Sequence, residues 1–321
     1  MQFDVFNGDA DGICALIQLR LAEPIEATLI TGVKRDIALL QRVQAGAGDS
    51  VTVLDVSLDK NRDALQDLLQ RQVEVFYVDH HQASDVPVHP CFKALIDTDA
   101  QVCTSWLVDR HLGHRFTAWA VAAAFGDNLE QSAAKAAESL GLSSSQCEQL
   151  RQLGICINYN AYGSDIADLH IAPDRLSKEL CCYVSPFDFM SEQAELFERL
   201  QEAYRADMAQ AEQWPAEFVS AGGAVFVLPD SKWARRVNGV WSNALANAHP
   251  GRAHAVLTPI HGGDYQVSVR APLNTRIGAD ELCQRFPSGG GRKAAAGINR
   301  LPADQLSSFI DAFARQYPMP C

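Results

Sequence analysis

Carboxylate and imidazole side chains follow three short apolar runs of this sequence. They are Asp9 and Asp11, then Asp55, and then Asp79, His80 and His81. Carboxylate oxygens and imidazole nitrogens together suit Mn²⁺, Mg²⁺, Fe²⁺ or Zn²⁺, and no thiolate belongs to the group. Several carboxylates placed close together repel one another unless a cation lies between them. Such a group can hold two metal ions about 3.5–4 Å apart, which would activate water for attack on a phosphoryl group.

Apolar runs and helical patterns alternate through the first half of the chain. The predicted strands span 3–6, 51–54, 73–78 and 94–96, and the predicted helices span 13–21, 61–71 and 104–112. This alternation predicts a mostly parallel sheet flanked by helices. In open sheets of this kind, ligands bind beyond the carboxyl ends of the strands. We therefore expect the acids and histidines to meet at one edge of the sheet.

The second half of the chain divides into a helical region, a linker and a smaller α/β pattern. Residues 117–153 predict helix, interrupted at Gly126-Asp127-Asn128, and the charged segment 191–214 predicts a connecting helix. Further strands are predicted at 224–228, 253–258 and 265–269, with helices at 241–248, 279–286 and 305–316. The expected fold is α/β, with a metal-binding catalytic domain over 1–190, a linker helix over 191–215 and a smaller α/β domain over 216–321.

Each feature has an ordinary structural explanation when it is taken alone. Asp9-Ala10-Asp11-Gly12 is compatible with a turn in which the glycine supplies positive φ. An Asp at a strand end often caps a helix, and two adjacent His residues can be a half-buried pair. Together, three strand ends that carry metal-ligand residue types favour a metal centre, because surface charge has no reason to gather at strand ends.

Motifs spread over nearly the whole chain resemble one known family. Asn7-Gly8-Asp9-Ala10-Asp11-Gly12, Asp55 after an apolar run, Asp79-His80-His81, and Asp127 after a helical segment are similar, in order, to motifs of the DHH phosphoesterases. Far downstream, residues 288–297 (Ser-Gly-Gly-Gly-Arg-Lys-Ala-Ala-Ala-Gly) resemble the Gly-Gly-Gly-His-x-x-Ala-Ala-Gly signature of the DHH-associated C-terminal domain. The resemblance implies a phosphoesterase of the nanoRNase or RecJ kind, with a catalytic domain and a substrate-binding domain.

The resemblance also implies metal ligands. One divalent ion, expected to be Mn²⁺, would be held by Asp11, Asp55, His80 and Asp127. A second ion would be held by Asp9 and Asp55. Many small members of the family carry His four residues before the first Asp, where this chain has Val5, which cannot bind a metal. The second site is therefore expected to have fewer protein ligands than the first.

Catalytic and substrate-binding roles follow from the same resemblance. His81 would contact the scissile phosphate or protonate the leaving group, and Asp79 would orient its neighbours. Substrate would be bound by Arg270, Gly289, Gly290, Gly291 and Arg292. Arg292 replaces the His of the family signature, and it offers a fork of hydrogen-bond donors but no acid–base chemistry near neutrality. The glycines are compatible with close backbone approach to an anion or with a flexible loop, and residues 158–163 with a base-stacking platform or a packed loop.

Charge and composition narrow the class of partner. The formal net charge is −12, whereas a protein that grips long duplex nucleic acid needs a basic footprint. Long duplexes are therefore not expected as partners. The first residues lack the features of a signal peptide, and the longest apolar stretch, 118–125, is too short to cross a bilayer. We expect a cytoplasmic protein with no membrane partner, and a homodimer is compatible with the sequence.

The expected function is hydrolysis of short oligoribonucleotides, above all 5′-phosphorylated diribonucleotides, to nucleoside monophosphates. Two enzymatic alternatives stay open: a RecJ-like single-strand exonuclease, and a phosphatase acting on cyclic dinucleotides or nucleotide bisphosphates. An inorganic pyrophosphatase is less expected, because that branch of the family lacks the Gly-Gly-Gly motif. A nucleotide-binding regulator without turnover is a further alternative, in view of Val5 and Arg292.

Overall fold

The chain forms two compact units, Met1–Gln201 and Glu202–Cys321, each with its own sheet. The structure, a computed structural model, describes residues 1–260 and 262–318. The boundary between the units falls inside the long helix α9 (Ala194–Glu212), in the region where the sequence predicts a connecting helix. The expected fold class, a helix-flanked parallel sheet followed by a second α/β unit, is confirmed.

Five parallel strands form the sheet of the first unit, in the order β2-β1-β3-β4-β5. They are β1 (Gln2–Phe6), β2 (Thr28–Ile30), β3 (Ser50–Leu54), β4 (Glu74–Asp79) and β5 (Phe92–Ile96). The edge strand β2 is the one that the sequence did not predict. It has three residues, none of them buried, so no run of alternating buried and exposed positions marks it.

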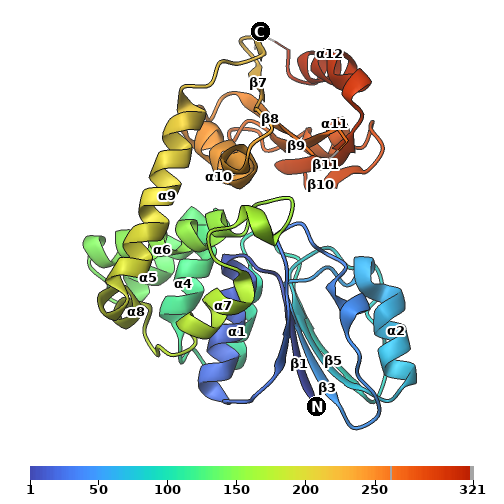
Figure 1. Cartoon of the computed structure of the whole chain (residues 1–321), viewed down its shortest axis with the longest axis vertical. Coiled ribbons are helices and arrows are strands. Elements are labelled where there is room, and N and C mark those ends of the chain that lie inside the picture. The colour runs from blue at the N-terminus through green and yellow to red at the C-terminus, as the bar shows by residue number, and fades with distance from the viewer. Residues whose placement is uncertain (261, 319–321) are drawn as a thin grey trace. The chain divides into compact units, whose positions relative to one another are not determined.

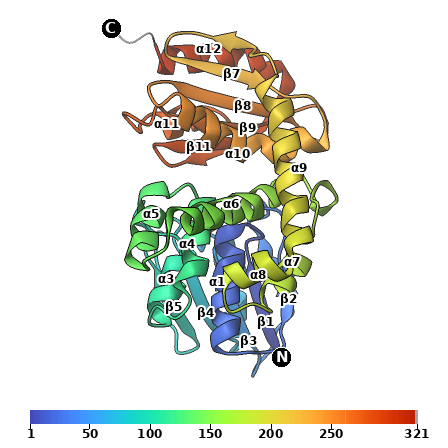
Figure 2. The ribbon, with the colours of Figure 1, turned by 90° about the vertical axis from the view of Figure 1, so that its left-hand side faces the viewer.

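Helices cover both faces of this sheet. Phe3 and Val5 of β1 pack with Leu65 and Leu68 of helix α2 (Arg62–Gln70) on one face. Figure 1 shows α2 on that side and α1 and α4 on the other, and Figure 2 shows α1 in front of the strands. The remaining helices of the unit are α1 (Ala10–Ala22), α3 (Thr104–His111), α4 (Thr117–Gly126), α5 (Glu130–Ser139), α6 (Ser144–Asn160), α7 (Pro173–Leu180) and α8 (Pro186–Glu192), with 3₁₀ turns at Leu39–Arg42, Asp59–Asn61 and Ile166–Asp168.

The second unit has a mixed sheet in the order β10-β11-β9-β8-β7-β6, in which β7 and β8 are parallel and the other pairs antiparallel. Its strands are β6 (Phe218–Val219), β7 (Gly223–Val227), β8 (Ala253–Pro259), β9 (Tyr265–Arg270), β10 (Gly289–Gly291) and β11 (Ala295–Leu301). Its helices are α10 (Lys232–Ala248), α11 (Ala279–Cys283) and α12 (Leu306–Gln316), with a 3₁₀ turn at Ala303–Gln305. The glycine-rich motif is therefore an edge strand, so the flexible-loop alternative does not hold.

Residues alternate between the two faces of β8, as expected for a strand buried on both sides. Ala255 and Leu257 join Phe309 and Phe313 of α12 in one core. Thr258 accepts a hydrogen bond from Asn238 of α10, at 3.2 Å. The sheet of the second unit is thus packed on both faces, and its glycine strand lies at one edge.

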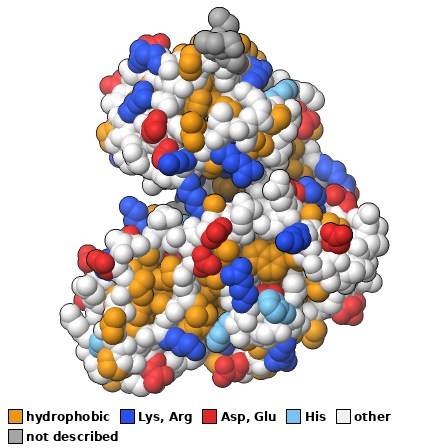
Figure 3. All heavy atoms as spheres, turned by 180° about the vertical axis from the view of Figure 1, so that it is seen from behind, with side chains coloured by type: hydrophobic (Ala, Val, Ile, Leu, Met, Phe, Trp, Pro, Cys, Tyr) orange, Lys and Arg blue, Asp and Glu red, His pale blue; other side chains and the backbone are white. Residues whose placement is uncertain are grey.

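Charged side chains of both signs occur on the face of the molecule drawn in Figure 3. Figure 3 shows Lys and Arg side chains interspersed with Asp and Glu on the face that it draws. Within the described residues, every helix is too short or too polar to span a lipid bilayer.

Candidate metal centre

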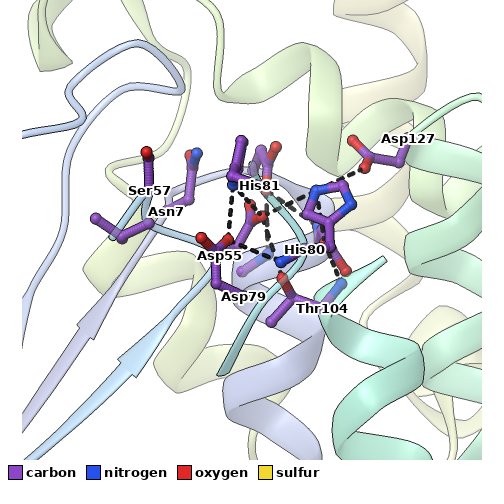
Figure 4. Close-up of polar contacts among 12 residues, drawn as sticks. Asn7, Asp55, Ser57, Asp79, His80, His81, Thr104 and Asp127 are labelled. Atoms are coloured by element: carbon purple, nitrogen blue, oxygen red, sulfur yellow. Dashed lines mark hydrogen bonds and ion pairs between the residues drawn. The ribbon is translucent and has the colours of Figure 1, made fainter. Parts of the chain in front are cut away.

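The acidic residues lie at the point where the connections of the first sheet diverge. The chain passes from β1 to the edge strand β2 and then returns to continue on the other side of β1 as β3. Ligands bind at such switch points in doubly wound sheets. Phe6 of β1 pairs with Leu54 of β3, which pairs with Val78 of β4. The three strands therefore end at one level, and the side chains that follow them share one edge (Figure 4).

Asp9 caps the helix that follows β1. Its Oδ1 accepts hydrogen bonds from the backbone N–H groups of Asp11 and Gly12, both at 3.1 Å, which is the usual role of Asp at a helix N-terminus. Gly12 lies inside α1 and has no positive φ. A Cβ on Gly12 would lie 2.2 Å from the carbonyl oxygen of Asn7. The glycine of this motif is thus required by close packing, so the alternative of a turn with a positive-φ glycine does not hold.

Asp11 is fully buried beneath the start of α3. Its two carboxylate oxygens accept hydrogen bonds from the backbone N–H groups of Thr104 and Ser105, both at 2.7 Å. These N–H groups belong to a helix N-terminus, which favours an anion. Burial and the charge of Asp127 nevertheless raise the pKa of Asp11 to about 6, against the opposing effect of His80. A cation placed beside Asp11 would restore its charged form.

Asp55 adopts a backbone conformation that side chains seldom tolerate. Its φ of 57° lies in the left-handed region, and such residues are often held there by a functional constraint. Its N–H donates to the carbonyl oxygen of Val78 at 3.1 Å, and its Oδ1 accepts a hydrogen bond from the Thr104 hydroxyl at 3.3 Å. Burial and the charges of Asp9 and Asp11 raise the pKa of Asp55 well above its usual value.

His80 lies between three of these carboxylates. Its Nδ1 is 2.8 Å from the carbonyl oxygen of Val102, and because a carbonyl only accepts, Nδ1 must carry the proton. Nε2 is then the ring nitrogen that faces the carboxylates. This atom is 3.4 Å from Asp55 Oδ1, 3.7 Å from Asp127 Oδ2 and 3.8 Å from Asp11 Oδ2. In Figure 4, His80 lies between Asp55 and Asp127. The second nitrogen of a metal-binding His is held by a backbone acceptor in this way in many proteins.

His81 and Asp79 form a pair beside this cluster. Asp79 is buried, and its Oδ1 accepts hydrogen bonds from the backbone N–H of His80 at 2.9 Å and from Nδ1 of His81 at 2.7 Å. The side chain of His81 is 39% exposed. Partial burial lowers the pKa of His81, but the hydrogen bond and charge of Asp79, together with the charge of Asp55, outweigh it, so that the pKa is raised. His81 is thereby suited to donate a proton near neutral pH.

Asp127 is placed by the close packing of α4. It is the residue that ends this helix. A Cβ on Gly154 of α6 would lie 1.9 Å from the carbonyl oxygen of Ala122, and a Cβ on Gly126 would lie 2.5 Å from the Cβ of Ala10. The two glycines therefore allow α4 to approach both α6 and α1. That approach brings Asp127 to the end of β1, although the two are far apart in the sequence.

Lys34 is a member of the cluster that the sequence did not predict. Its Nζ contacts Asp9 Oδ2 and lies 3.3 Å from Asp127 Oδ1 and 3.0 Å from Asn158 Oδ1. It also lies over the ring of Tyr162, 5.7 Å from the centroid, at a distance typical of a cation–π contact. Burial lowers the pKa of Lys34. The charges of Asp9, Tyr162 and Asp127 raise it by more than burial lowers it, so the pKa of Lys34 lies well above its usual value.

The segment 158–163 packs into this region and does not form an exposed stacking platform. Tyr159 and Tyr162 are buried, and the hydroxyl of Tyr159 lies 2.9 Å from Nε2 of His170. Asn160 exchanges hydrogen bonds with the backbone of Ile171, at 2.8 and 3.0 Å. The packed-loop interpretation of the sequence is the one that holds, with Asn158 as the member that reaches the acidic cluster.

The substrate-binding residues expected in the second unit gather at one end of its sheet. Arg270 ends β9 and pairs across the sheet with Ala295, whose backbone exchanges hydrogen bonds of 2.8 and 3.1 Å with Arg292. The guanidinium of Arg270 donates to Asn243 Oδ1 at 2.7 Å and to Ser268 Oγ at 3.1 Å. The backbones of both arginines therefore lie beside Ala295, on its two sides, and the side chain of Arg270 is held by hydrogen bonds within the unit.

The three glycines of β10 differ in what surrounds them. A Cβ on Gly289 would lie 1.8 Å from the carbonyl oxygen of Cys283, and a Cβ on Gly291, whose φ is 139°, would lie 2.5 Å from the Cα of Ala296. A Cβ on Gly290 would meet nothing within 4 Å. Two glycines are thus required by the packing of the unit itself, and Gly290 is the one whose backbone is open to a ligand.

Comparison with solved structures places this arrangement in a known fold. No protein-family model and no curated protein sequence matches the chain. Several solved structures match nearly all of it, among them the following three. Exonuclease RecJ bound to manganese matches with TM-score 0.58 and 17% identity, over 99% of this chain and 91% of that one. The DHH domain of PF0399, a member of a family of ribosomal proteins, matches with TM-score 0.59 and 14% identity, over 98% and 86%. The pGpG-specific phosphodiesterase PggH from Vibrio cholerae matches with TM-score 0.57 and 13% identity, over 98% of both chains.

The chain has the fold of DHH-domain proteins. Within the described residues, two groups of three side chains offer ligand atoms that all lie within 4.8 Å of one another: Asp11, His80 and Asp127, and Asp55, His80 and His81. These oxygen and nitrogen donors suit a hard or borderline divalent cation. The raised pKa values of Asp11 and Asp55 reflect crowded negative charge that such a cation would relieve. The residues present therefore fit one divalent ion.

Proposed function

We propose that this chain is a metal-dependent phosphodiesterase that hydrolyses short oligonucleotides, with 5′-phosphorylated diribonucleotides as its preferred substrates. The observation that carries the proposal is the position of His80. Its Nδ1 is fixed by Val102, and its Nε2 is within 3.8 Å of carboxylate oxygens of Asp11, Asp55 and Asp127, which come from three separate segments of the chain. A ring nitrogen on which carboxylates converge is the arrangement expected of a divalent-cation site.

The metal ion would be held by Asp11, Asp55, His80 and Asp127, with Mn²⁺ the expected ion. When bound, a divalent ion supplies Lewis-acid activation of water and stabilises negative charge on the phosphoryl group. The chain preorganises this site, because the N–H groups of Thr104 and Ser105 hold the carboxylate of Asp11 and the Thr104 hydroxyl holds the carboxylate of Asp55. Hydrogen bonds of this kind orient the carboxylates that would bind the metal.

His81 would act on the leaving group. Its Nδ1–H bonds to the buried carboxylate of Asp79 at 2.7 Å, which orients the ring and stabilises its protonated form. The raised pKa of His81 keeps the proton available at neutral pH for the oxygen that departs from phosphorus. This is general acid catalysis, which contributes about 10²- to 10⁴-fold to a rate.

Three features support a short substrate. The net charge of −12 disfavours tracking along a polyanionic strand. Figure 3 shows basic side chains interspersed with acidic ones. PggH, described as specific for the dinucleotide pGpG, matches over 98% of both chains. In the second unit, Arg270, Gly290 and Arg292 would bind the terminal phosphate or a base.

A substrate panel tests this function. The purified chain would be incubated with Mn²⁺ and labelled RNAs of about two to ten nucleotides, with and without a 5′-phosphate, and the products identified. We expect nucleoside monophosphates, with turnover fastest on the phosphorylated dimer. Asp55→Ala would serve as the inactive control. Equal or faster turnover of the longer chains would overturn the preference for dimers.

The same panel separates the alternatives. Stepwise degradation of single-stranded DNA would identify a RecJ-like exonuclease, and turnover of cyclic dinucleotides or nucleotide bisphosphates would identify a phosphatase of that class. Binding without turnover, with the ligand response retained in Asp55→Ala and His80→Ala, would identify a regulator.

A further inference from the structure

The ammonium group of Lys34 stands beside the acidic cluster as a fixed positive charge. Its Nζ has oxygen partners in Asp9, Asp127 and Asn158, which come from three different segments of the chain. An ammonium offers three donors, so these partners match its full donor capacity. Asn158 is 2% exposed. Its amide oxygen is thus shielded from water, and the Lys34 ammonium supplies it with a hydrogen bond.

The backbone of Lys34 is held as firmly as its side chain. The N–H of Lys34 donates to the carbonyl oxygen of Ala161 at 2.8 Å, and its carbonyl oxygen accepts a hydrogen bond from the Asn7 amide at 3.3 Å. Ala161 follows α6, and Asn7 follows β1. The segment after β2 is therefore tied to two of the elements that build the cluster, and the face of Tyr162 adds a further contact to the cation.

Both carboxylate oxygens of Asp9 have partners within the chain. Its Oδ1 caps α1 through two N–H groups, and its Oδ2 pairs with Lys34. Val5 is fully buried in the core beneath α2 and offers no ligand atom. Neither group of converging ligand atoms includes Asp9. The donors present on this side of the cluster therefore fit an ammonium better than they fit a second divalent cation.

We propose that the Lys34 ammonium takes the place of a second metal ion, so that each chain binds one divalent ion, at Asp11, Asp55, His80 and Asp127. The inference rests on the metal centre of the proposed function, and it departs from the two-ion site that the sequence resemblance implies. A phosphate bound at this site would meet one divalent ion and one ammonium. The ammonium supplies positive charge and hydrogen-bond donors, but it has no coordination site for water.

Metal stoichiometry tests the inference directly. The full-length chain would be stripped of metal, titrated with Mn²⁺ in a calorimeter, and examined by elemental analysis and electron paramagnetic resonance. We expect one Mn²⁺ per wild-type chain and the signal of an isolated ion. In Lys34→Met, the loss of the charge frees Asp9, and we expect a second, weaker Mn²⁺ and the signal of an exchange-coupled pair. Lys60→Met, which removes the same charge at an exposed position, should bind one.

Two outcomes would overturn the inference. Two Mn²⁺ ions on the wild-type chain would mean that Lys34 moves aside when metal binds, and a single ion on Lys34→Met would mean that the lysine does not exclude the second. Lys34→Gln, which keeps a hydrogen-bond donor without the charge, provides the same measurement where the Met variant folds poorly. The number of bound ions is measured apart from turnover. A chain that binds one ion and hydrolyses no nucleotide would refute the proposed function alone, and an active chain with two ions would refute this inference alone.

Discussion

Two candidate ligand sites differ in how their residues are held: the first edge, at the carboxyl ends of the strands in the first sheet (Asp11 and Asp55), and the second edge, at the glycine strand of the second sheet (Gly290 and Arg292). At the first edge, Asp11 and Asp55 are almost completely buried, and the chain's own N–H and hydroxyl groups fix their carboxylates. At the second edge, Gly290 has open space around it and Arg292 is exposed. Substitutions at the first edge should therefore change the chemistry, and substitutions at the second should change affinity.

Electrostatics separates the two edges as well. Burial and mutual repulsion raise the pKa values of Asp11 and Asp55, so the first edge stores unfavourable charge that a cation relieves. The second edge carries arginines, and Arg270 is held by neutral partners, Asn243 and Ser268. The first edge thus favours a metal ion, and the second an anionic group of the substrate.

His80→Ala should give the largest effect, because it removes the nitrogen on which three carboxylates converge. We expect Mn²⁺ affinity to fall by more than the roughly 10- to 100-fold that loss of a partner around a metal ligand costs. We expect kcat to fall by about 10²- to 10³-fold or more, the scale for losing a preorganised electrostatic group. Calorimetry and product analysis would measure the two, with His111→Ala, an exposed His outside the cluster, as the control. If His80→Ala kept the wild-type Mn²⁺ affinity and kcat, the first edge would not be the site of the chemistry.

The residues of the first edge could be predicted because two independent patterns coincide there. Apolar runs mark β1, β3 and β4, and the acids follow each run directly, so parallel strands must bring them to one edge. Asp127 was predicted only through the family resemblance. No local pattern shows that Gly126 and Gly154 let α4 approach its neighbours closely enough to deliver it.

Lys34 could not be predicted, because all its partners are distant in the sequence. Asp127 and Asn158 lie 93 and 124 residues away, and the strand before Lys34 is too short to show a period. The glycines show the same limit. The sequence shows only that Gly12, Gly289 and Gly291 are glycines, which is compatible with backbone flexibility. In the structure, the backbone of a neighbouring segment leaves no room for a side chain at any of the three positions.

Arg270→Met should give an intermediate effect of a different kind. Because the guanidinium would bind the substrate equally in the ground and transition states, we expect KM to rise with little change in kcat. The rise should be about 10- to 100-fold, the scale of a hydrogen bond to a charged group, roughly 1.5–3 kcal/mol. Steady-state kinetics on a 5′-phosphorylated dimer would measure it. Arg300→Met, which removes an exposed arginine of the same sheet, is the control, and a loss confined to kcat would place Arg270 in the chemistry.

Gly290→Ala should give the smallest effect on activity and the sharpest test of the second edge. The added Cβ meets no atom of the protein, so thermal stability should stay unchanged. A ligand that approaches the backbone there would be displaced, and KM should rise a few-fold, which corresponds to about 1 kcal/mol or less, at the low end of the cost of overpacking.

Gly289→Ala is the matched control for Gly290→Ala, because its Cβ would collide with the carbonyl oxygen of Cys283. We expect it to lower the free energy of unfolding by about 1–3 kcal/mol, the cost of overpacking, as measured by thermal denaturation. If Gly290→Ala leaves KM unchanged while Gly289→Ala destabilises the unit, the glycine strand serves only packing. Substrate affinity at the second edge would then depend on Arg270 and Arg292 alone.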